Sequence, residues 1–391
     1  MKICLTYPFY LPYIGGIELH INELATYLAG QGHEVCIFTS MLKKDLFKTG
    51  YALKFDQSLE QLETENNNNI IIRRFNPNIY LPRGKLATLQ FLYEYSETFR
   101  RFKAKNHFDV IHWHSFQKGA INLLLDSNSC TNNVLTLHGT FYPVHDPFFY
   151  KRVFMNSVLR KLDGIICISK ETMMDALKCG VDESKLHLLP NWVDTDLFKP
   201  VDKQASLDGV KCVLYVGRMV KEKGVDVLIA ALSDLLQEGV KIKGLLIGDG
   251  PDLPYFINLA KQLGIEKNLL FTGNVPLGKT ALYYSMADVF VLLSTHEPQG
   301  RVLLEAMSAG VPVVAFKSEG VREIVPPNVG ILLEDRSVSA AKEAIYQLLS
   351  DEKKTRILQE NARKFVAQNY GTKVILPRIE HIYESVIISG S

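Results

Sequence analysis

Short, continuous apolar runs alternate with amphipathic stretches of helical length along almost the whole chain. The runs are rich in valine, isoleucine and leucine and do not alternate with polar residues, which predicts strands buried on both faces. In the first half they are Lys2–Tyr7, Glu34–Thr39, Ile70–Arg74, Asp109–Trp113, Val134–His138, Gly164–Ile168 and Leu186–Leu189. In the second half they are Lys211–Val216, Gly244–Ile247, Leu269–Thr272, Asp288–Leu293, Pro312–Ala315 and Gly330–Leu333. Such strands joined by helices predict an α/β fold with doubly wound parallel sheets.

The apolar periodicity breaks between Asp194 and Gly209, and a new strand begins just after the break. A chain of 391 residues is long for one core and suits two domains. We therefore expect a first Rossmann-like domain at residues 1–200 and a second at 201–371, with the C-terminal helix, residues 372–391, packing back on the first. The two sheets would face a central cleft, where such folds bind ligands. The polar stretch Gln57–Asn69 predicts a flexible loop.

The charge and cysteine content limit the partners and the compartment. Lys and Arg number 44 and Asp and Glu 42, a net charge of +2, so no strong field favours nucleic acid or an anionic bilayer. The basic clusters Arg100–Lys103 and Lys151–Arg152 predict solvated helix faces, with membrane-surface contact as the alternative. The six cysteines form no Cys-x-x-Cys pair, and no run resembles a signal peptide or a membrane span. The sequence predicts a cytoplasmic protein, with peripheral membrane contact left open.

Two acids follow the strand Asp288–Leu293. Glu297 is expected in the strand-to-helix loop and Glu305 early in the helix. Gly300, between them, lets the backbone approach a ligand closely, and the amides that follow form a helix N-terminus that suits an anion. Two carboxylates would repel a phosphate, so sugar hydroxyls are their natural partners. The alternative is that Glu305 lies on an exposed helix face, but its apolar neighbours in the sequence favour burial.

A second strand-to-helix segment, Val216–Gly224, carries two cations after Gly217. Arg218 leaves the end of the strand and Lys223 precedes the next helix. A guanidinium fork and an ammonium point charge suit a pyrophosphate. The alternative is a solvated basic loop.

Three elements of the first half lie at the ends of predicted strands. Gly15 and Gly16 precede a helix after the first strand, where they allow close approach to a phosphate or a sugar. His138 ends a buried strand at the expected ligand edge, and a structural role is its alternative. His112 and His114 could form a metal pair, but no third ligand stands at close spacing.

The segment Gly273–Thr280 matches the phosphate-binding loop G-x-x-x-x-G-K-[ST], with Lys279 as its lysine. A nucleoside triphosphatase is therefore an alternative function. This loop normally follows the first strand of its fold, with an aspartate ending a later strand to hold magnesium. Here it follows a late strand, and Asp288 begins its strand.

Taken together, these elements resemble the large retaining glycosyltransferase family of GT-B fold, glycosyl transferases group 1. The matching pieces are Gly15-Gly16, Gly32–Val35, Leu189–Asn191 with Val193-Asp194, Gly217-Arg218 with Lys223-Gly224, Gly248–Pro251, Ala287–Phe290 and the Glu297/Glu305 pair. The resemblance runs nearly end to end. It is most specific in the Glu-x7-Glu element followed by Ala306-Met307 and Gly310-x-Pro312. The family has a similar Gly-x-Val-Pro segment near the nucleotide base, which displaces the triphosphatase interpretation of Gly273–Thr280.

The resemblance implies a role for each site residue. Arg218 and Lys223 would hold the donor diphosphate, Glu305 the ribose hydroxyls, and Glu297 the donor sugar. The implied catalytic residues are Arg218, Lys223, Glu297 and His138, with His138 contacting the sugar from the first domain. The implied donor-binding residues are Gly15, Gly16, Gly217, Asp249, Val275, Gln299, Gly300, Arg301 and Glu305. The chain departs from the family's Glu-Gly-Phe-Gly at Pro298 and Gln299, which puts sugar recognition in question.

The implied activity is retaining, metal-independent transfer of a hexose-type sugar from a nucleotide-sugar, such as a UDP- or GDP-sugar, to a hydroxyl group. The acceptor would be a glycan, a lipid-linked molecule or a small molecule, and loops such as Met41–Asn69 and Phe141–Phe149 would select it. No cofactor and no nucleic acid are expected. An epimerase or sugar-nucleotide binding protein on the same fold is a further alternative. Asp194–Asp196 matches the metal-binding Asp-x-Asp of another glycosyltransferase class, but a turn or helix cap is the expected role.

Overall fold

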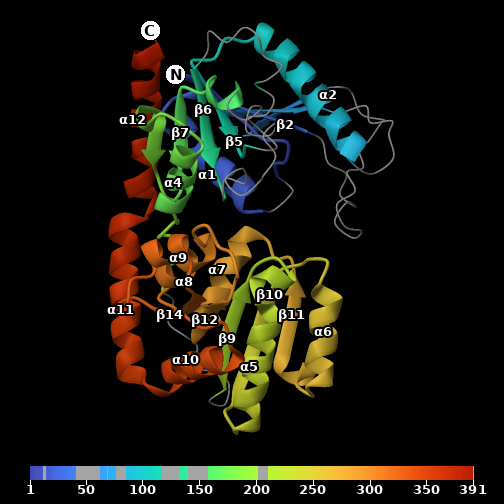
Figure 1. Cartoon of the computed structure of the whole chain (residues 1–391), viewed down its shortest axis with the longest axis vertical. Coiled ribbons are helices and arrows are strands. Elements are labelled where there is room, and N and C mark those ends of the chain that lie inside the picture. Colours follow the sequence, from blue (N-terminus) through green and yellow to red (C-terminus); the bar gives the residue numbers. More distant parts are fainter. Residues whose placement is uncertain are drawn as a thin grey trace. The chain divides into compact units, whose positions relative to one another are not determined.

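A computed structural model describes residues 1–11, 15–40, 62–67, 69–75, 85–116, 123, 132–139, 157–200 and 210–390. The basic pair at 151–152, the loop at 141–149 and most of 41–69 lie outside these residues. The chain forms two compact units, Met1–Leu189 with Leu376–Ser391, and Pro190–Ile375 (Figure 1). The break precedes the expected one at residue 200, because Val193 pairs with Gly371 and Phe198 joins the second core. Which unit serves the acceptor stays a prediction.

The first unit holds an eight-stranded sheet in the order β3-β4-β2-β1-β5-β6-β7-β8. The strands are β1 (Lys2–Thr6), β2 (Glu34–Ser40), β3 (Leu62–Asn67), β4 (Ile70–Phe75), β5 (Val110–His114), β6 (Asn132–Leu137), β7 (Gly164–Cys167) and β8 (Leu186–Leu188). The helices described in this unit include α1 (Gly16–Gly30), α2 (Lys85–Ala104) and α4 (Lys170–Lys178). Every strand predicted from the apolar runs forms close to its expected bounds.

The prediction of a loop at Gln57–Asn69 was wrong over Leu62–Asn67. This segment forms β3, the only antiparallel strand among those described, and it pairs with the outer edge of β4. An edge strand needs only backbone hydrogen bonds on one side, so a polar sequence can form it. The other described neighbours in this sheet are parallel, as predicted.

The second unit holds six parallel strands in the order β11-β10-β9-β12-β13-β14. They are β9 (Lys211–Val216), β10 (Ile242–Ile247), β11 (Leu269–Gly273), β12 (Val289–Leu292), β13 (Val313–Phe316) and β14 (Ile331–Leu333). The helices are α5 (Val225–Gln237), α6 (Leu253–Gln262), α7 (Leu277–Met286), α8 (Arg301–Ser308), α9 (Glu319–Ile324), α10 (Val338–Ser350) and α11 (Glu352–Asn369). The chain moves outward from β9 in one direction and returns on the other side at β12. The loops after β9 and β12 therefore diverge at a topological switch point, where such sheets bind ligands.

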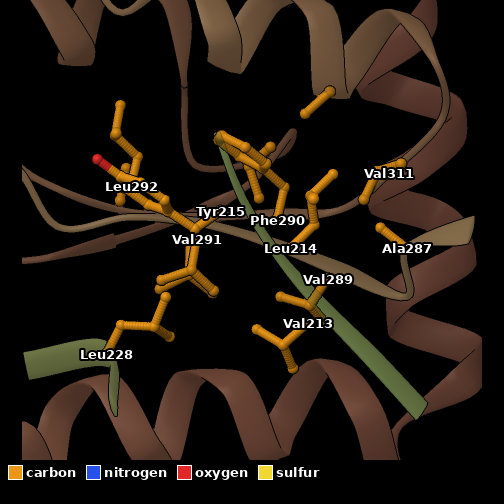
Figure 2. Packing of buried hydrophobic residues seen from close by; sticks show 14 of the residues in the cluster. Val213, Leu214, Tyr215, Leu228, Ala287, Val289, Phe290, Val291, Leu292 and Val311 are labelled. Carbon is orange, nitrogen blue, oxygen red and sulfur yellow. The ribbon is translucent and has the colours of Figure 1, made fainter. Parts of the chain in front are cut away.

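The core of the second unit explains why its strands lack polar positions. Val213 and Leu214 of β9 lie in register with Val289 and Phe290 of β12, and all four are buried. Figure 2 shows their side chains with that of Leu228 from α5. Fully burying one such side chain stabilises the fold by about 1.5–3 kcal/mol. Helices cover both faces of the sheet, so both faces must be apolar.

The last helix, α12 (Thr372–Gly390), starts in the second unit and runs into the first. Within the first unit, Glu380 accepts a hydrogen bond from Tyr27 at 2.6 Å and lies 2.8 Å from His33 Nε2. Tyr383 of the same helix is fully buried, and its hydroxyl lies 2.7 Å from His112 Nδ1. These contacts hold the C-terminal part of α12 on the first unit.

Candidate functional site

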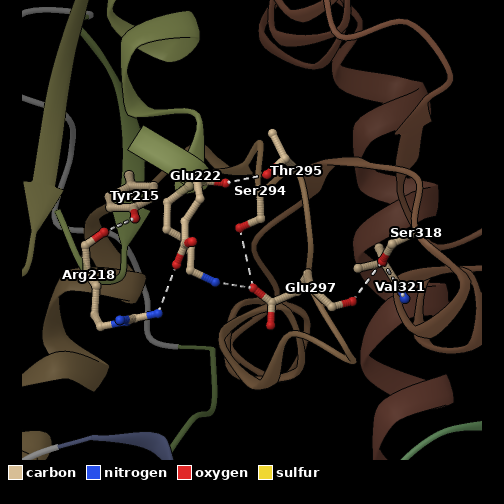
Figure 3. Close-up of polar contacts among 9 residues, drawn as sticks. Tyr215, Arg218, Glu222, Ser294, Thr295, Glu297, Ser318 and Val321 are labelled. Atoms are coloured by element: carbon tan, nitrogen blue, oxygen red, sulfur yellow. Dashed lines mark hydrogen bonds and ion pairs between the residues drawn. The ribbon is translucent and has the colours of Figure 1, made fainter. Parts of the chain in front are cut away.

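The loops after β9 and β12 meet through an ion pair between Lys223 and Glu297. Lys223 Nζ lies 2.7 Å from Glu297 Oε2, and each side chain keeps only 16% of its surface exposed. Ser294 Oγ donates to the same carboxylate oxygen at 3.3 Å. Figure 3 shows Ser294 and Glu297 beside the loop from β9. Two residues far apart in the sequence thus form a largely buried ion pair at the switch point.

Arg218 lies on the same loop but faces water. Its side chain is 60% exposed, and its guanidinium lies 3.1 Å from Glu222. Its backbone carbonyl accepts a hydrogen bond from Tyr215 at 2.9 Å (Figure 3). The carbonyl of Glu222 in turn accepts from the amide of Thr295 at 2.8 Å. Hydrogen bonds thus hold the backbone of the two loops together. The exposed guanidinium of Arg218 can exchange the carboxylate of Glu222 for a ligand.

Gly300 begins α8 in a left-handed conformation, with φ of 81°. A Cβ at this position would lie 2.9 Å from Leu303 Cδ1 and 3.2 Å from Glu297 Cγ, so glycine is needed for both space and conformation. Among the described residues, no side chain caps this helix end. The first-turn amides of α8 and the helix dipole therefore form a site suited to a negative group.

Glu305 is buried, with 4% of its surface exposed, so its alternative assignment to an exposed helix face was wrong. Tyr284 of α7 donates to Glu305 Oε2 at 3.0 Å, and Arg301 Nε lies 3.4 Å from Oε1. Burial, with the neighbouring charge of Glu305 as the next cause, raises the pKa of Tyr284 well above its usual value. Tyr284 is a site residue that the sequence analysis missed.

The segment that departs from the family pattern is held tightly by its surroundings. Gln299 is 1% exposed, and its Oε1 accepts from the amide of Asn191 at 2.8 Å. The hydroxyl of Ser318 donates to the carbonyl of Glu297 at 2.8 Å. A Cβ on Gly320 would lie 1.6 Å from the carbonyl oxygen of Pro298. The side-chain carbonyl of Gln299 thus already accepts a hydrogen bond within the protein. The expected contact of Gln299 with the nucleotide-sugar remains a prediction.

Three further expected residues follow strands β9, β10 and β11. The amide of Gly217 donates to Ile247 at 3.0 Å, and the carbonyl of Asp249 accepts from Met219 at 3.0 Å. Val275 is partly buried against the core. These positions share the carboxyl edge of the sheet with Lys223 and Glu297.

The triphosphatase interpretation of Gly273–Thr280 does not fit the structure. β11 ends at Gly273 and α7 begins at Leu277, so few residues remain between them to wrap a phosphate. Asp288 precedes β12 and accepts from the amide of Cys212 at 2.7 Å. It therefore lies at the opposite edge of the sheet from this segment.

In the first unit, Gly15 caps α1 and Gly16 is its first residue. A Cβ on Gly16 would meet nothing within 4 Å among the described residues, so packing does not require glycine there. His138 follows β6 and is partly exposed. His112 places its two nitrogens 2.7 Å from Tyr383 and 2.7 Å from Thr136, so it does not pair with His114 as a metal site.

The histidines gather differently from the prediction. Ligand atoms of His20, His114 and His138 all lie within 4.8 Å of one another, which is spacing that could hold a metal. The absence of a metal requirement remains a prediction. Asp194 forms the expected turn, with its carboxylate accepting from the amides of Asp196 and Leu197 at 2.9 and 3.0 Å.

No helix among the described residues has the length and apolar character to cross a membrane.

Curated relatives span almost the whole chain. The alpha-monoglucosyldiacylglycerol synthase of Streptococcus pneumoniae is 26% identical over 100% of this chain and 87% of its own length. The N-acetyl-alpha-D-glucosaminyl L-malate synthase of Bacillus anthracis is also 26% identical, over 96% of this chain and 95% of its own.

Solved structures share the fold. Sucrose-phosphate synthase from Thermosynechococcus elongatus has a TM-score of 0.80 at 23% identity and covers 99% of both chains. Anabaena HepE in complex with UDP-glucose has a TM-score of 0.76 at 22% identity, covering 98% of this chain and 100% of its own. The family model Glycosyltransferase Family 4 matches residues 14–197, and Glycosyl transferases group 1 matches residues 199–365. The chain therefore belongs to the group 1 (family 4) glycosyltransferases and is a glycosyltransferase of GT-B fold.

Proposed function

We propose that the protein transfers a hexose-type sugar from a nucleotide-sugar to a hydroxyl acceptor, with retention of anomeric configuration and without a metal. The observation that carries the proposal is the pairing of Lys223 with Glu297 at the switch point of the second sheet. The same sheet edge holds a second cation, Arg218, and the uncapped end of α8. This set of groups matches the parts of a nucleotide-sugar: cations and amides for the diphosphate, and carboxylates for hydroxyls.

The difficult step is departure of the nucleoside diphosphate from the anomeric carbon. Negative charge grows on the leaving phosphate, so Lys223, Arg218 and the α8 amides would stabilise the transition state. Glu297 would accept hydrogen bonds from sugar hydroxyls, Glu305 from the ribose, and His138 would contact the sugar. With the leaving phosphate helping to deprotonate the acceptor on the same face, no carboxylate nucleophile is required.

Two comparisons support the choice of donor and leave the acceptor broad. HepE was solved with UDP-glucose, which makes a UDP-sugar the first donor to test. The two curated relatives named above are a glucosyldiacylglycerol synthase and a glucosaminyl malate synthase. We therefore propose a lipid-linked, glycan or small-molecule hydroxyl as acceptor.

The test begins with thermal unfolding of the full chain against UDP-, GDP- and ADP-sugars. A true donor stabilises the fold by RT ln(1 + [L]/Kd), about 2.7 kcal/mol at a hundredfold excess over Kd. Transfer from that donor is then measured in Lys223→Ala and in the control Lys279→Ala. We expect Lys223→Ala to abolish transfer and Lys279→Ala to retain it, and NMR to show the donor's anomeric configuration kept in the product. Wild-type turnover in folded Lys223→Ala, or magnesium-dependent nucleotide hydrolysis lost in Lys279→Ala, would refute the proposal.

A further inference from the structure

Histidine rings from three elements cluster in the first unit, and the proposed function uses only one of them. His138 follows β6, His114 ends β5, and His20 lies in the first turns of α1. The ring of His138 lies 5.3 Å from that of His114 in a stacked arrangement and 4.6 Å from that of His20 edge to face. His114 Nδ1 and His138 Nε2 are 3.0 Å apart, at hydrogen-bond distance.

The rings of His114 and His138 are uncharged at neutral pH. The ring of His138 is desolvated by its neighbours, although part of the residue is exposed, and this desolvation lowers its pKa to about 3. Burial, with the charges of neighbouring histidines as smaller causes, also lowers the pKa of His114 well below its usual value. A neutral imidazole carries one proton, so one of its nitrogens donates and the other accepts. The hydrogen bond between the two rings therefore has one of two directions.

The surroundings of His114 select the direction. His114 is fully buried, and its Nε2 has no hydrogen-bond partner among the residues that the structure describes. A proton on Nε2 would leave a buried N–H unpaired, which is rarer in proteins than an unpaired acceptor. With the proton on Nδ1, His114 donates to His138 Nε2. His138 must then carry its own proton on Nδ1.

We propose that His114 is a positioning residue that donates from Nδ1 to His138 Nε2 and holds His138 as the Nδ1–H tautomer. His138 then serves as a hydrogen-bond donor to an oxygen of the bound sugar, and not as a general base. The inference rests on the proposed contact between His138 and the donor sugar. The inference adds His114 as the residue that fixes the tautomer of His138. It also specifies that His138 donates a hydrogen bond from Nδ1 and accepts one at Nε2.

The first experiment reads the tautomer without any activity. The full chain is labelled with ¹⁵N-histidine, and the His138 ring is assigned by its loss in His138→Gln. We expect the wild-type ring to show protonated Nδ1 and unprotonated Nε2 from pH 6 to 8. In His114→Leu the ring should become a mixture of tautomers. In His114→Asn, whose amide stands near the position of Nδ1, the Nδ1–H form should return.

The second experiment measures transfer in the same variants. We expect kcat to fall about tenfold in His114→Leu, the effect of one hydrogen bond, with KM for the donor changing less. His114→Asn should recover most of the loss. Between pH 5 and 8, kcat should depend on pH in the same way in the wild-type protein and in His138→Gln, because His138 does not ionise in this range.

Several outcomes would overturn the inference. A protonated Nε2 on wild-type His138, or unchanged kcat in His114→Leu while His138→Ala is inactive, would refute the role of His114. Full activity in His138→Ala would instead refute the proposed sugar contact. Addition of Zn²⁺ to the chelator-treated protein provides one further check. Tight binding that shifts the ¹⁵N signals of His20, His114 and His138 would make the cluster a metal site and refute the hydrogen-bonded arrangement.

Discussion

Lys223→Met removes the cation of the Lys223–Glu297 pair and leaves a carboxylate in a site where each side chain is only 16% exposed. Among the residues that the structure describes, the hydroxyl of Ser294 remains as a hydrogen-bond donor to Glu297 Oε2, at 3.3 Å. A single neutral hydrogen bond cannot replace an ammonium group at 2.7 Å. The variant should therefore be destabilised as well as inactive, and the two effects need to be separated.

The size of the loss follows from burial. Removing one partner of a buried ion pair costs about 3–5 kcal/mol. Glu297 keeps some contact with solvent and a hydrogen bond from Ser294, so we expect a cost of about 3 kcal/mol here. For a domain of this size, that lowers the midpoint of thermal unfolding by about 6–12 °C. Glu297→Gln added to Lys223→Met removes the stranded charge. The double variant should recover about 2 kcal/mol and still fail to transfer sugar.

Scanning calorimetry of the full chain and a donor-dependent transfer assay together test this reasoning. A matched control is Lys342, which lies 2.7 Å from Glu238 in the same unit, with Glu238 53% exposed. Lys342→Met should cost much less than Lys223→Met, because an exposed ion pair contributes little to stability. Equal midpoints for Lys223→Met and the double variant would show that the pair is not a buried ion pair in the free protein. A Lys342→Met loss as large as that of Lys223→Met would show that burial is not the cause.

Two further predictions concern stability. Burial lowers the pKa of His112 from 6.5 to about 3, with the charge of His138 a smaller cause, so the unfolded chain binds more protons between these values. The stability of the first unit should fall by up to about 1.4 kcal/mol per pH unit for this group as the pH drops from 6.5 to 3, and denaturant titrations of His112→Asn should show a shallower dependence. An unchanged slope would contradict the assignment. Gly320→Ala must displace the Pro298 carbonyl, 1.6 Å from the new Cβ, whereas Gly278→Ala in α7 meets nothing within 4 Å among the described residues. The first should lower the unfolding midpoint and raise KM for the donor, the second should stabilise by up to about 1 kcal/mol, and equal effects would refute the steric argument.

The strands could be predicted because parallel strands under helices are apolar on both faces, a signal that Val213 and Phe290 carry plainly. β3 could not, since an edge strand needs no apolar face, and the asparagines of Leu62–Asn67 are typical of a loop. The exact residue at which the second unit begins could not be predicted for a different reason. The apolar periodicity stops between Asp194 and Gly209, whereas the second compact unit already begins at Pro190.

The candidate site was partly predictable from strand order. Lys223 and Glu297 each follow a strand, and parallel strands bring their carboxyl ends to one edge, so the sequence could place both there. It could not predict Tyr284, because that contact depends on the rotation of α7 against α8. His20 was also missed, although α1 follows β1 and β1 lies beside β5, where His114 ends the strand. Once the strand order is known, the gathering of these histidines follows.

Three cations of the candidate site share one further property, which bears on how a sugar donor would enter. Lys223, Arg218 and Arg301 lie 2.7, 3.1 and 3.4 Å from Glu297, Glu222 and Glu305. Each cation is thus held near an acid, which lowers the repulsion among positive groups on one sheet edge. An incoming diphosphate would have to replace a carboxylate, and exchange is easiest where both groups are exposed, at Arg218 and Glu222. Arg218 is therefore suited to make the first contact, and the drier Lys223–Glu297 pair to fix the position of the sugar phosphate.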